Sequence, residues 1–236
     1  MSDHAINLEP IVDKYKANDN TAGLLLFGSA FFGRNDKYSD IDIYVIGFKP
    51  AKISREQFKI GDQTFDVLFD CIDEVKKLIS EEKNQIRRNV SLMVGNSKVI
   101  FQKSDEMEGL IRSAKECLAT ETTYSDEQRL MHRYSIEDFL SDAQRDFESM
   151  NWTGFWLNAG FVLQNCIEVV LKAAGDYFRK PSDTITQLNR LDPEFCALLK
   201  SFFELSDKSE RANVLQELAA RGLAKAGGPL PPNWKI

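Results

Sequence analysis

The sequence contains few of the residues that bind zinc or cross-link small extracellular domains. Only two histidines and four cysteines occur among its 236 residues, and no two cysteines are spaced C-x-x-C. This pattern excludes a zinc-binding motif and a disulfide framework. We expect four buried, reduced thiols in a cytoplasmic protein. They are Cys71, Cys117, Cys166 and Cys196.

The sequence also lacks a long apolar run and an excess of basic charge. No stretch approaches the roughly 20 apolar residues of a membrane-spanning helix, and MSDHAINLEP at the start does not resemble a signal peptide. We therefore expect no membrane partner. Because 36 acidic residues exceed 30 basic ones, the net charge is −6. Long nucleic acid is then an unfavourable partner, and cationic small molecules or metal ions are favoured.

The first half of the chain mixes strand and helix patterns. Apolar residues at helical spacing predict helices, and alternating apolar and polar residues predict strands. Gly61-Asp62 between two short apolar runs indicates a hairpin. The expected helices are 7–18, 72–82 and 105–119, and the expected strands are 24–27, 41–46, 57–60, 64–69 and 98–101.

The second half of the chain has helix patterns alone. Ser125 and Gln128 have the spacing of a capping box, which predicts the start of a long helix. Together the two halves predict an α+β protein with a mixed β-sheet domain at 1–120, a helical bundle at 121–225 and an irregular tail at 226–236. The expected helices of the bundle are 125–150, 152–178, 193–205 and 207–225.

Three aspartates are candidates for a metal site. Asp40 and Asp42 stand at the start of an expected strand, and side chains two residues apart in a strand point to the same face. Two adjacent carboxylates repel each other unless a cation lies between them, and Mg²⁺ prefers oxygen ligands. Asp66 can join them if its strand is the neighbour of 41–46. Three carboxylates can hold two metal ions about 3.5–4 Å apart for phosphoryl chemistry.

Gly28 and Ser29 are candidates for binding phosphate. They follow the apolar strand 24–27 directly, and a strand that turns into a short helix exposes backbone N–H groups to an anion. The small side chains let phosphates come close, and the Ser29 hydroxyl adds a donor. Gly33 ends the GSAFFG segment and permits a further turn.

The stretch GSAFFGRNDKYSDIDIYV resembles the active-site motif of the nucleotidyltransferase superfamily related to DNA polymerase β, G-S-x-x-x-G followed by [S/D]-D-x-D. The resemblance covers roughly residues 20–105. It implies that Asp40 and Asp42 bind two Mg²⁺ ions and that Asp66 completes the site nearer the nucleophile. It also implies that Gly28 and Ser29 hold the triphosphate of an NTP.

Residues 125–225 resemble the helical domain of two-domain kanamycin and lincosamide nucleotidyltransferases, chiefly through NAGFVLQNCIEVVLKAAG. Relatives that are ribonucleases carry R-x4-6-H, which no arginine after His132 can complete here. In the antibiotic enzymes a helical-domain carboxylate can act as base or bind an acceptor ammonium. Glu137, Asp138 and Glu168 are the substrate-binding candidates, although Glu168 could instead form a surface ion pair with Lys172.

These features predict a cytoplasmic, Mg²⁺-dependent nucleotidyltransferase that moves NMP from an NTP, such as ATP, to an acceptor hydroxyl and releases pyrophosphate. A small cationic acceptor such as an aminoglycoside or lincosamide would make it an antibiotic-resistance enzyme, and a homodimer would suit a shared cleft. Two alternatives stay open. One is a toxin–antitoxin type of enzyme that modifies a protein or tRNA, and the other is a non-catalytic nucleotide-binding module.

Overall fold

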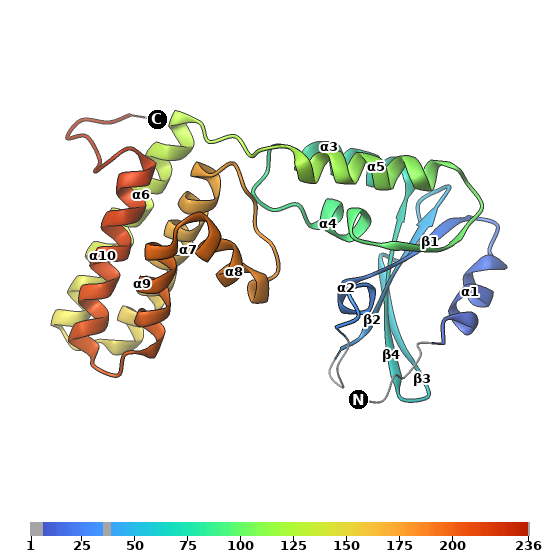
Figure 1. Ribbon diagram of the computed structural model, residues 1–236, viewed down its shortest axis with the longest axis horizontal. Coiled ribbons are helices and arrows are strands. Elements are labelled where there is room, and N and C mark those ends of the chain that lie inside the picture. The colour runs from blue at the N-terminus through green and yellow to red at the C-terminus, as the bar shows by residue number, and fades with distance from the viewer. Residues whose placement is uncertain (1–6, 35–38, 236) are drawn as a thin grey trace. The chain divides into compact units, whose positions relative to one another are not determined.

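The computed structural model describes residues 7–34 and 39–235 and divides into two compact units (Figure 1). The first contains Met1–Asn84 and Arg88–Thr120, and the second contains Gln85–Arg87 and Glu121–Ile236. The first holds a mixed β-sheet with helices and the second is helical, which confirms the predicted α+β class. The sequence did not indicate that residues 85–87 belong to the second unit.

The sheet of the first unit has five strands in the order β3-β4-β2-β1-β5. β2 and β4 are parallel neighbours, and the pairs β1–β2, β1–β5 and β3–β4 are antiparallel. β1 is buried along its whole length because it lies between two strands, and both faces of the sheet are covered by core side chains. The bounds are β1 Thr21–Phe27, β2 Ile41–Gly47, β3 Arg55–Ile60, β4 Gln63–Cys71 and β5 Lys98–Gln102.

Each face of the sheet is covered by helices, as the alternation of side chains requires. One face, with Tyr44, Ile46 and Leu68, packs on α3 (Ile72–Glu82), α4 (Asn89–Gly95) and α5 (Glu106–Ala119). The other face, with Ile43, Val45 and Val67, packs on α1 (Glu9–Lys16). Figure 1 shows these helices on opposite sides of the sheet.

Helix α4 is an addition to the predicted elements, and contacts remote in sequence hold it in place. The Glu82 carboxylate accepts the N–H groups of Val90 (2.8 Å) and Ser91 (2.7 Å) at its first turn. The preceding residue, Arg88, is fully buried and donates to the carbonyls of Lys83, Cys117 and Thr120. Because the groups that hold this helix come from other segments of the chain, the residues of α4 themselves show no pattern that predicts its start.

The helical unit is built around α7, which packs against α6, α10 and α8. The prediction that this helix runs to 178 is wrong. It ends at Ala173, because Gly175 adopts φ +68° and turns the chain back so that its carbonyl accepts the Thr122 N–H. Helix α8 was also missed. The bounds are α6 Asp126–Glu148, α7 Trp152–Ala173, α8 Pro181–Leu191, α9 Pro193–Glu204 and α10 Lys208–Ala226.

By length and hydropathy α7 would be able to cross a membrane, which the sequence analysis did not anticipate. Its mean hydropathy reaches 1.3 over an 18-residue window, of which 44% is buried in the structure. Val162, Cys166 and Val169 are fully buried in the core of the helical unit. A core helix passes the same test as a membrane span, so α7 alone is weak evidence for a membrane.

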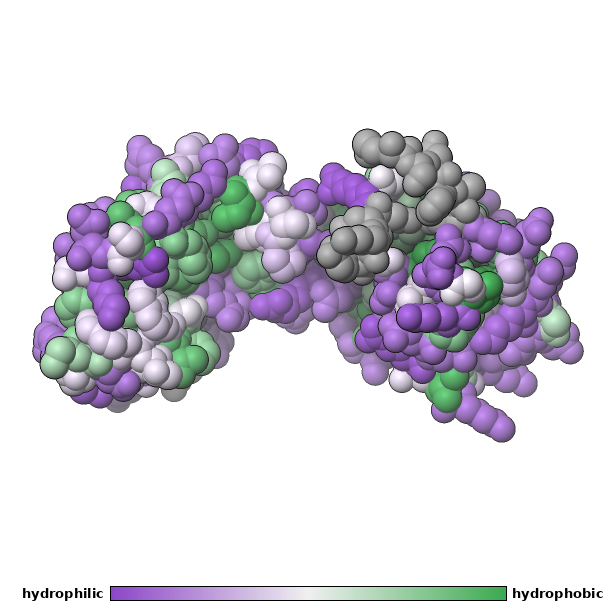
Figure 2. All heavy atoms as spheres, turned by 90° about the horizontal axis from the view of Figure 1, so that it is seen from below, coloured by the Kyte–Doolittle hydropathy of each residue, from purple (hydrophilic) through white to green (hydrophobic). Residues whose placement is uncertain are grey.

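On the face of the helical unit seen in Figure 2, apolar side chains gather in patches between polar ones. The most exposed large apolar side chains of the helical unit include Met150, Leu157 and Phe203. All four cysteines of the chain are free and buried, as predicted.

Candidate active site

Asp42 and Asp66 lie side by side on neighbouring parallel strands. In the β2–β4 register Asp42 pairs directly with Asp66, which places both on the sheet face of Tyr44 and Leu68. Asp40 precedes Asp42 by two residues, and its Oδ2 accepts a 3.2 Å hydrogen bond from Nε2 of Gln57 on β3. The three predicted carboxylates therefore belong to one end of the β2–β4–β3 part of the sheet.

Arg55 on β3 forms an ion pair with one of these carboxylates, Asp66. Its Nε donates to Asp66 Oδ1 at 2.7 Å and its Nη2 donates to Oδ2, so both oxygens of Asp66 are engaged. The hydrogen bond and charge of Asp66, with the charges of Asp42 and Asp40, raise the pKa of Arg55 above its ordinary value. All three carboxylates thus act on one guanidinium group.

The donor chemistry fits Mg²⁺, because every candidate ligand is a carboxylate oxygen. Within the described residues, no three His, Cys, Asp or Glu side chains are gathered closely enough to enclose a metal ion. The Arg55 guanidinium supplies the positive charge that the carboxylates require, and it holds Asp66 toward β3. Asp40, Asp42 and Asp66 are the residues that would hold a divalent ion, and Asp66 is at present paired with Arg55.

Gly28 lies against the Asp42 carboxylate at the end of β1. Phe27 is the register partner of Asp42, and Gly28 follows it with φ +71° at the start of the short helix α2 (Gly28–Phe31). A Cβ atom on Gly28 would lie 1.9 Å from Asp42 Oδ2. Both the backbone conformation and this close approach require glycine. Ser29 is partly exposed beside it.

Sequence reasoning missed Arg55 and Gln57 as parts of this site. They alternate along β3, where Arg55 pairs with Leu68 and Gln57 with Asp66 in antiparallel register. The predicted strand 57–60 began at Gln57, and the signal available was the position of Arg55 two residues before it, which an earlier start of the strand places on the same face. An edge strand that pairs with the Asp66 strand can place every second side chain beside it.

The substrate-binding candidates of the helical unit contact different partners. Glu137 Oε1 accepts the N–H of Leu230 in the tail at 2.7 Å, whereas Asp138 is exposed. Within the described residues, the ion-pair partners of Glu168 are Arg87 at 4.0 Å and His132 at 3.5 Å, rather than the Lys172 considered above.

Glu168 belongs to a polar network around His132. His132 is buried, and its Nδ1 lies 3.1 Å from the Tyr124 hydroxyl oxygen. Burial acts to raise the pKa of Glu168, but hydrogen bonds from His132 and Gln164 and the charge of Arg87 outweigh it and lower that pKa. Burial raises the pKa of Tyr124 to about 12. Glu168 is therefore an ionised carboxylate whose oxygens already face His132, Gln164 and Arg87.

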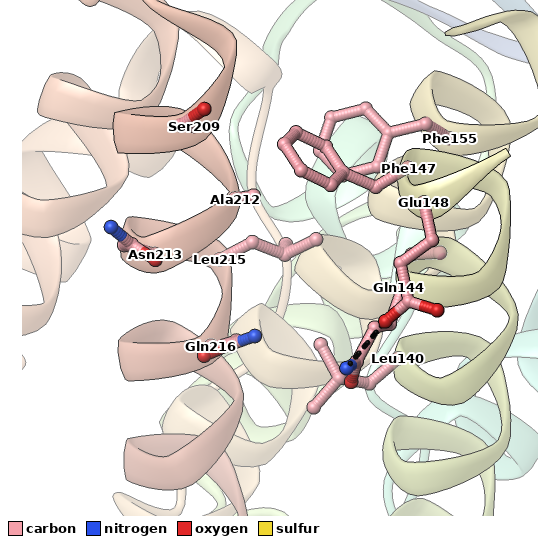
Figure 3. A pocket seen from close by; sticks show the side chains of 11 residues that line it. Leu140, Gln144, Phe147, Glu148, Phe155, Ser209, Ala212, Asn213, Leu215 and Gln216 are labelled. Atoms are coloured by element: carbon pink, nitrogen blue, oxygen red, sulfur yellow. Dashed lines mark hydrogen bonds between the residues drawn. The ribbon is translucent and has the colours of Figure 1, made fainter. Parts of the chain in front are cut away.

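A groove of about 230 Å³ lies between α6 and α10 of the helical unit (Figure 3). Apolar side chains, including Phe147 and Leu215, line it, and Gln144 donates to Glu148 at its rim (3.1 Å). None of the three predicted substrate-binding acids lines this groove.

Comparison with known proteins gives a result at the level of the fold. No protein-family model matches the sequence, and no curated protein matches it. Eleven chains of solved structures are similar, among them a nucleotidyltransferase-like protein from Exiguobacterium sibiricum 255-15. The TM-score is 0.54 and the identity 13%, over 93% of this chain and 76% of that one. The fold is therefore like that of a nucleotidyltransferase-like protein, and this likeness supports no particular subfamily.

Proposed function

We propose that the protein is a metal-dependent nucleotidyltransferase that transfers NMP from an NTP to an acceptor hydroxyl and releases pyrophosphate. The observation that carries the proposal is the direct pairing of Asp42 with Asp66 beside the backbone of Gly28. Two carboxylates paired on neighbouring parallel strands repel each other without a cation. Because Gly28 has no side chain, the Asp42 carboxylate can lie against its backbone at the end of β1. The fold likeness supports the same reading.

The roles of the residues follow from their places. Asp40, Asp42 and Asp66 would hold the metal ions, which when bound lower the pKa of the acceptor hydroxyl and neutralise charge on the leaving pyrophosphate. Gly28 and Ser29 would orient the triphosphate through backbone N–H groups and the Ser29 hydroxyl. The acceptor oxygen forms a bond to the α-phosphorus, and the bond from that phosphorus to the bridging oxygen breaks. Asp66, or an acid of the helical unit, would take the acceptor proton.

The acceptor that we propose is a small cationic molecule with hydroxyl groups, such as an aminoglycoside or a lincosamide. The net charge of −6 favours a cationic acceptor. In the helical unit Asp138 is exposed and suited to an ammonium group, whereas Glu168 already faces Arg87 and His132.

The test is pyrophosphate release with Mg²⁺, each of the four NTPs and a panel of aminoglycosides and lincosamides. Asp42→Asn is expected to lower the rate about a hundredfold or more, the scale of losing one preorganised electrostatic contact. Asp62→Asn is the matched control, since it removes the same charge from the exposed hairpin turn. Equal rates in Asp42→Asn and the wild type would contradict the proposal.

The acceptor is tested separately in the same assay. Release that needs one antibiotic identifies a small-molecule acceptor. Transfer of α-labelled NMP to a protein or RNA instead would replace the acceptor and keep the reaction. Nucleotide binding without release under any of these conditions would replace the enzyme with a binding module.

A further inference from the structure

Arg55 connects the edge strand β3 to the carboxylates of the candidate site. Its guanidinium engages both oxygens of Asp66, and Asp40 and Asp42 add to the negative potential around it. Asp66 has a side chain that is only 10% exposed, whereas that of Arg55 is 64% exposed. The pair therefore joins a nearly buried anion to a cation that has open solvent on its other side.

We propose that Arg55 is the resident counter-cation of the site and that a divalent metal ion must displace it from Asp66. The inference rests on the proposed function, because it takes Asp66 as a metal ligand. It makes Arg55 a positioning residue that acts through Asp66.

Arg55 and a metal ion would compete for the same two oxygens of Asp66. A metal ion takes electron pairs of carboxylate oxygens, and in Asp66 both oxygens already accept from Arg55. A guanidinium and a divalent cation also repel each other at short range. Simultaneous binding to Asp66 is therefore unfavourable, and each cation weakens the binding of the other.

Without a metal ion, Asp66 needs another positive charge beside it. A nearly buried carboxylate that lacks a partner is costly, and crowding by Asp42 at the same level of the sheet adds to that cost. Arg55 removes the cost by pairing with Asp66, and Gln57 does the same for Asp40 with a neutral donor. The Arg55 side chain, which is 64% exposed, can then swing into solvent when a metal ion arrives.

The test is a titration of the whole chain with Mn²⁺ in the absence of nucleotide. Binding is measured by calorimetry or by the paramagnetic resonance signal of free Mn²⁺. Arg55→Gln is expected to bind Mn²⁺ about tenfold more tightly than the wild type, within the usual range of coupling between two sites. Lys59→Gln is the control. It makes the same charge change on the same strand and face, about 13 Å from Arg55.

A second pair of variants separates action through Asp66 from a general effect of charge. In the Asp66→Asn background, Arg55→Gln is expected to change Mn²⁺ affinity much less than in the wild type. An equal gain in both backgrounds would overturn the role of Asp66 in the competition.

The outcomes distinguish this inference from the proposed function. Equal Mn²⁺ affinity in the wild type and Arg55→Gln, or weaker binding in the variant, overturns the counter-cation role while the metal site stands. Mn²⁺ binding that neither Asp42→Asn nor Asp66→Asn weakens overturns the metal site, and with it both proposals. Thermal melts of each variant establish that the fold is retained.

Discussion

Gly28→Ala is the sharpest test of the site, because the structure supplies a matched control. Gly28 has φ +71°, and a Cβ atom there would lie 1.9 Å from Asp42 Oδ2. Gly61, in the β3–β4 turn, has φ +58°, and a Cβ atom there would have nothing within 4 Å. The two substitutions therefore impose the same backbone strain, and only one of them displaces a site carboxylate.

The magnitudes follow from these two geometries. An alanine in the left-handed region costs about 1–2 kcal/mol, so both variants are expected to lose that much stability. In a unit of about a hundred residues each kcal/mol lowers the melting temperature by about 4–8 °C. In Gly28→Ala, Asp42 must also move by about 1.5–2 Å to restore van der Waals contact. A displacement of about 1 Å in a reacting constellation can cost about a hundredfold in rate.

Two measurements on the same samples check this reasoning. Thermal unfolding is expected to show a lower melting temperature for both Gly28→Ala and Gly61→Ala. The decrease is expected to be somewhat larger for Gly28→Ala, because its new Cβ atom also displaces Asp42. Pyrophosphate release, compared at a temperature where all variants are folded, is expected to fall about a hundredfold only in Gly28→Ala. Full activity in Gly28→Ala would refute the placement of Gly28 and Asp42 in one site.

Two further predictions concern stability. Arg88→Leu is expected to destabilise the first unit by about 3 kcal/mol or more, because three carbonyls lose a fully buried charged donor, and urea unfolding measures the loss. In the helical unit, burial acts to raise the pKa of Asp192, but the Phe195 N–H, Lys225 and Arg221 outweigh it and lower that pKa. A lowered folded-state pKa stabilises the protein above the unfolded value of about 3.9 and ceases to do so as pH falls through the folded value. Asp192→Asn, which keeps a capping side chain, is therefore expected to be about 1–2 kcal/mol less stable at pH 7, and the difference is expected to shrink as pH falls toward 2.5 in thermal melts. A difference that does not depend on pH would contradict the assignment.

Several elements were predictable from local pattern, and others were not. The alternation of Ile41, Ile43 and Val45 indicates β2, and the helix expected at 72–82 is found at those residues. Helix α8 was missed because PSDTITQLNRL contains several poor helix formers, and its stability comes from burial of Leu188 and from the hydrogen bond of Gln187 to the Tyr177 carbonyl.

The candidate site divides in the same way. The two-residue spacing of Asp40 and Asp42, and the glycine after a buried strand, follow from the chain itself, because the period of a strand sets which side chains share a face. The pairing of Asp42 with Asp66 required the strand order, since a parallel partner is chosen by the whole sheet.

The partners of the carboxylates were decided by tertiary structure alone. Arg55 meets Asp66 across the β3–β4 hairpin, where the register of the two strands decides which side chains are neighbours, and Glu168 meets Arg87 only through the fold of the helical unit. The sequence by itself determined which residues can carry charge and how they alternate along each strand. Only the folded chain decided which opposite charge meets each carboxylate, because an ion pair depends on distance in space and not on separation along the chain.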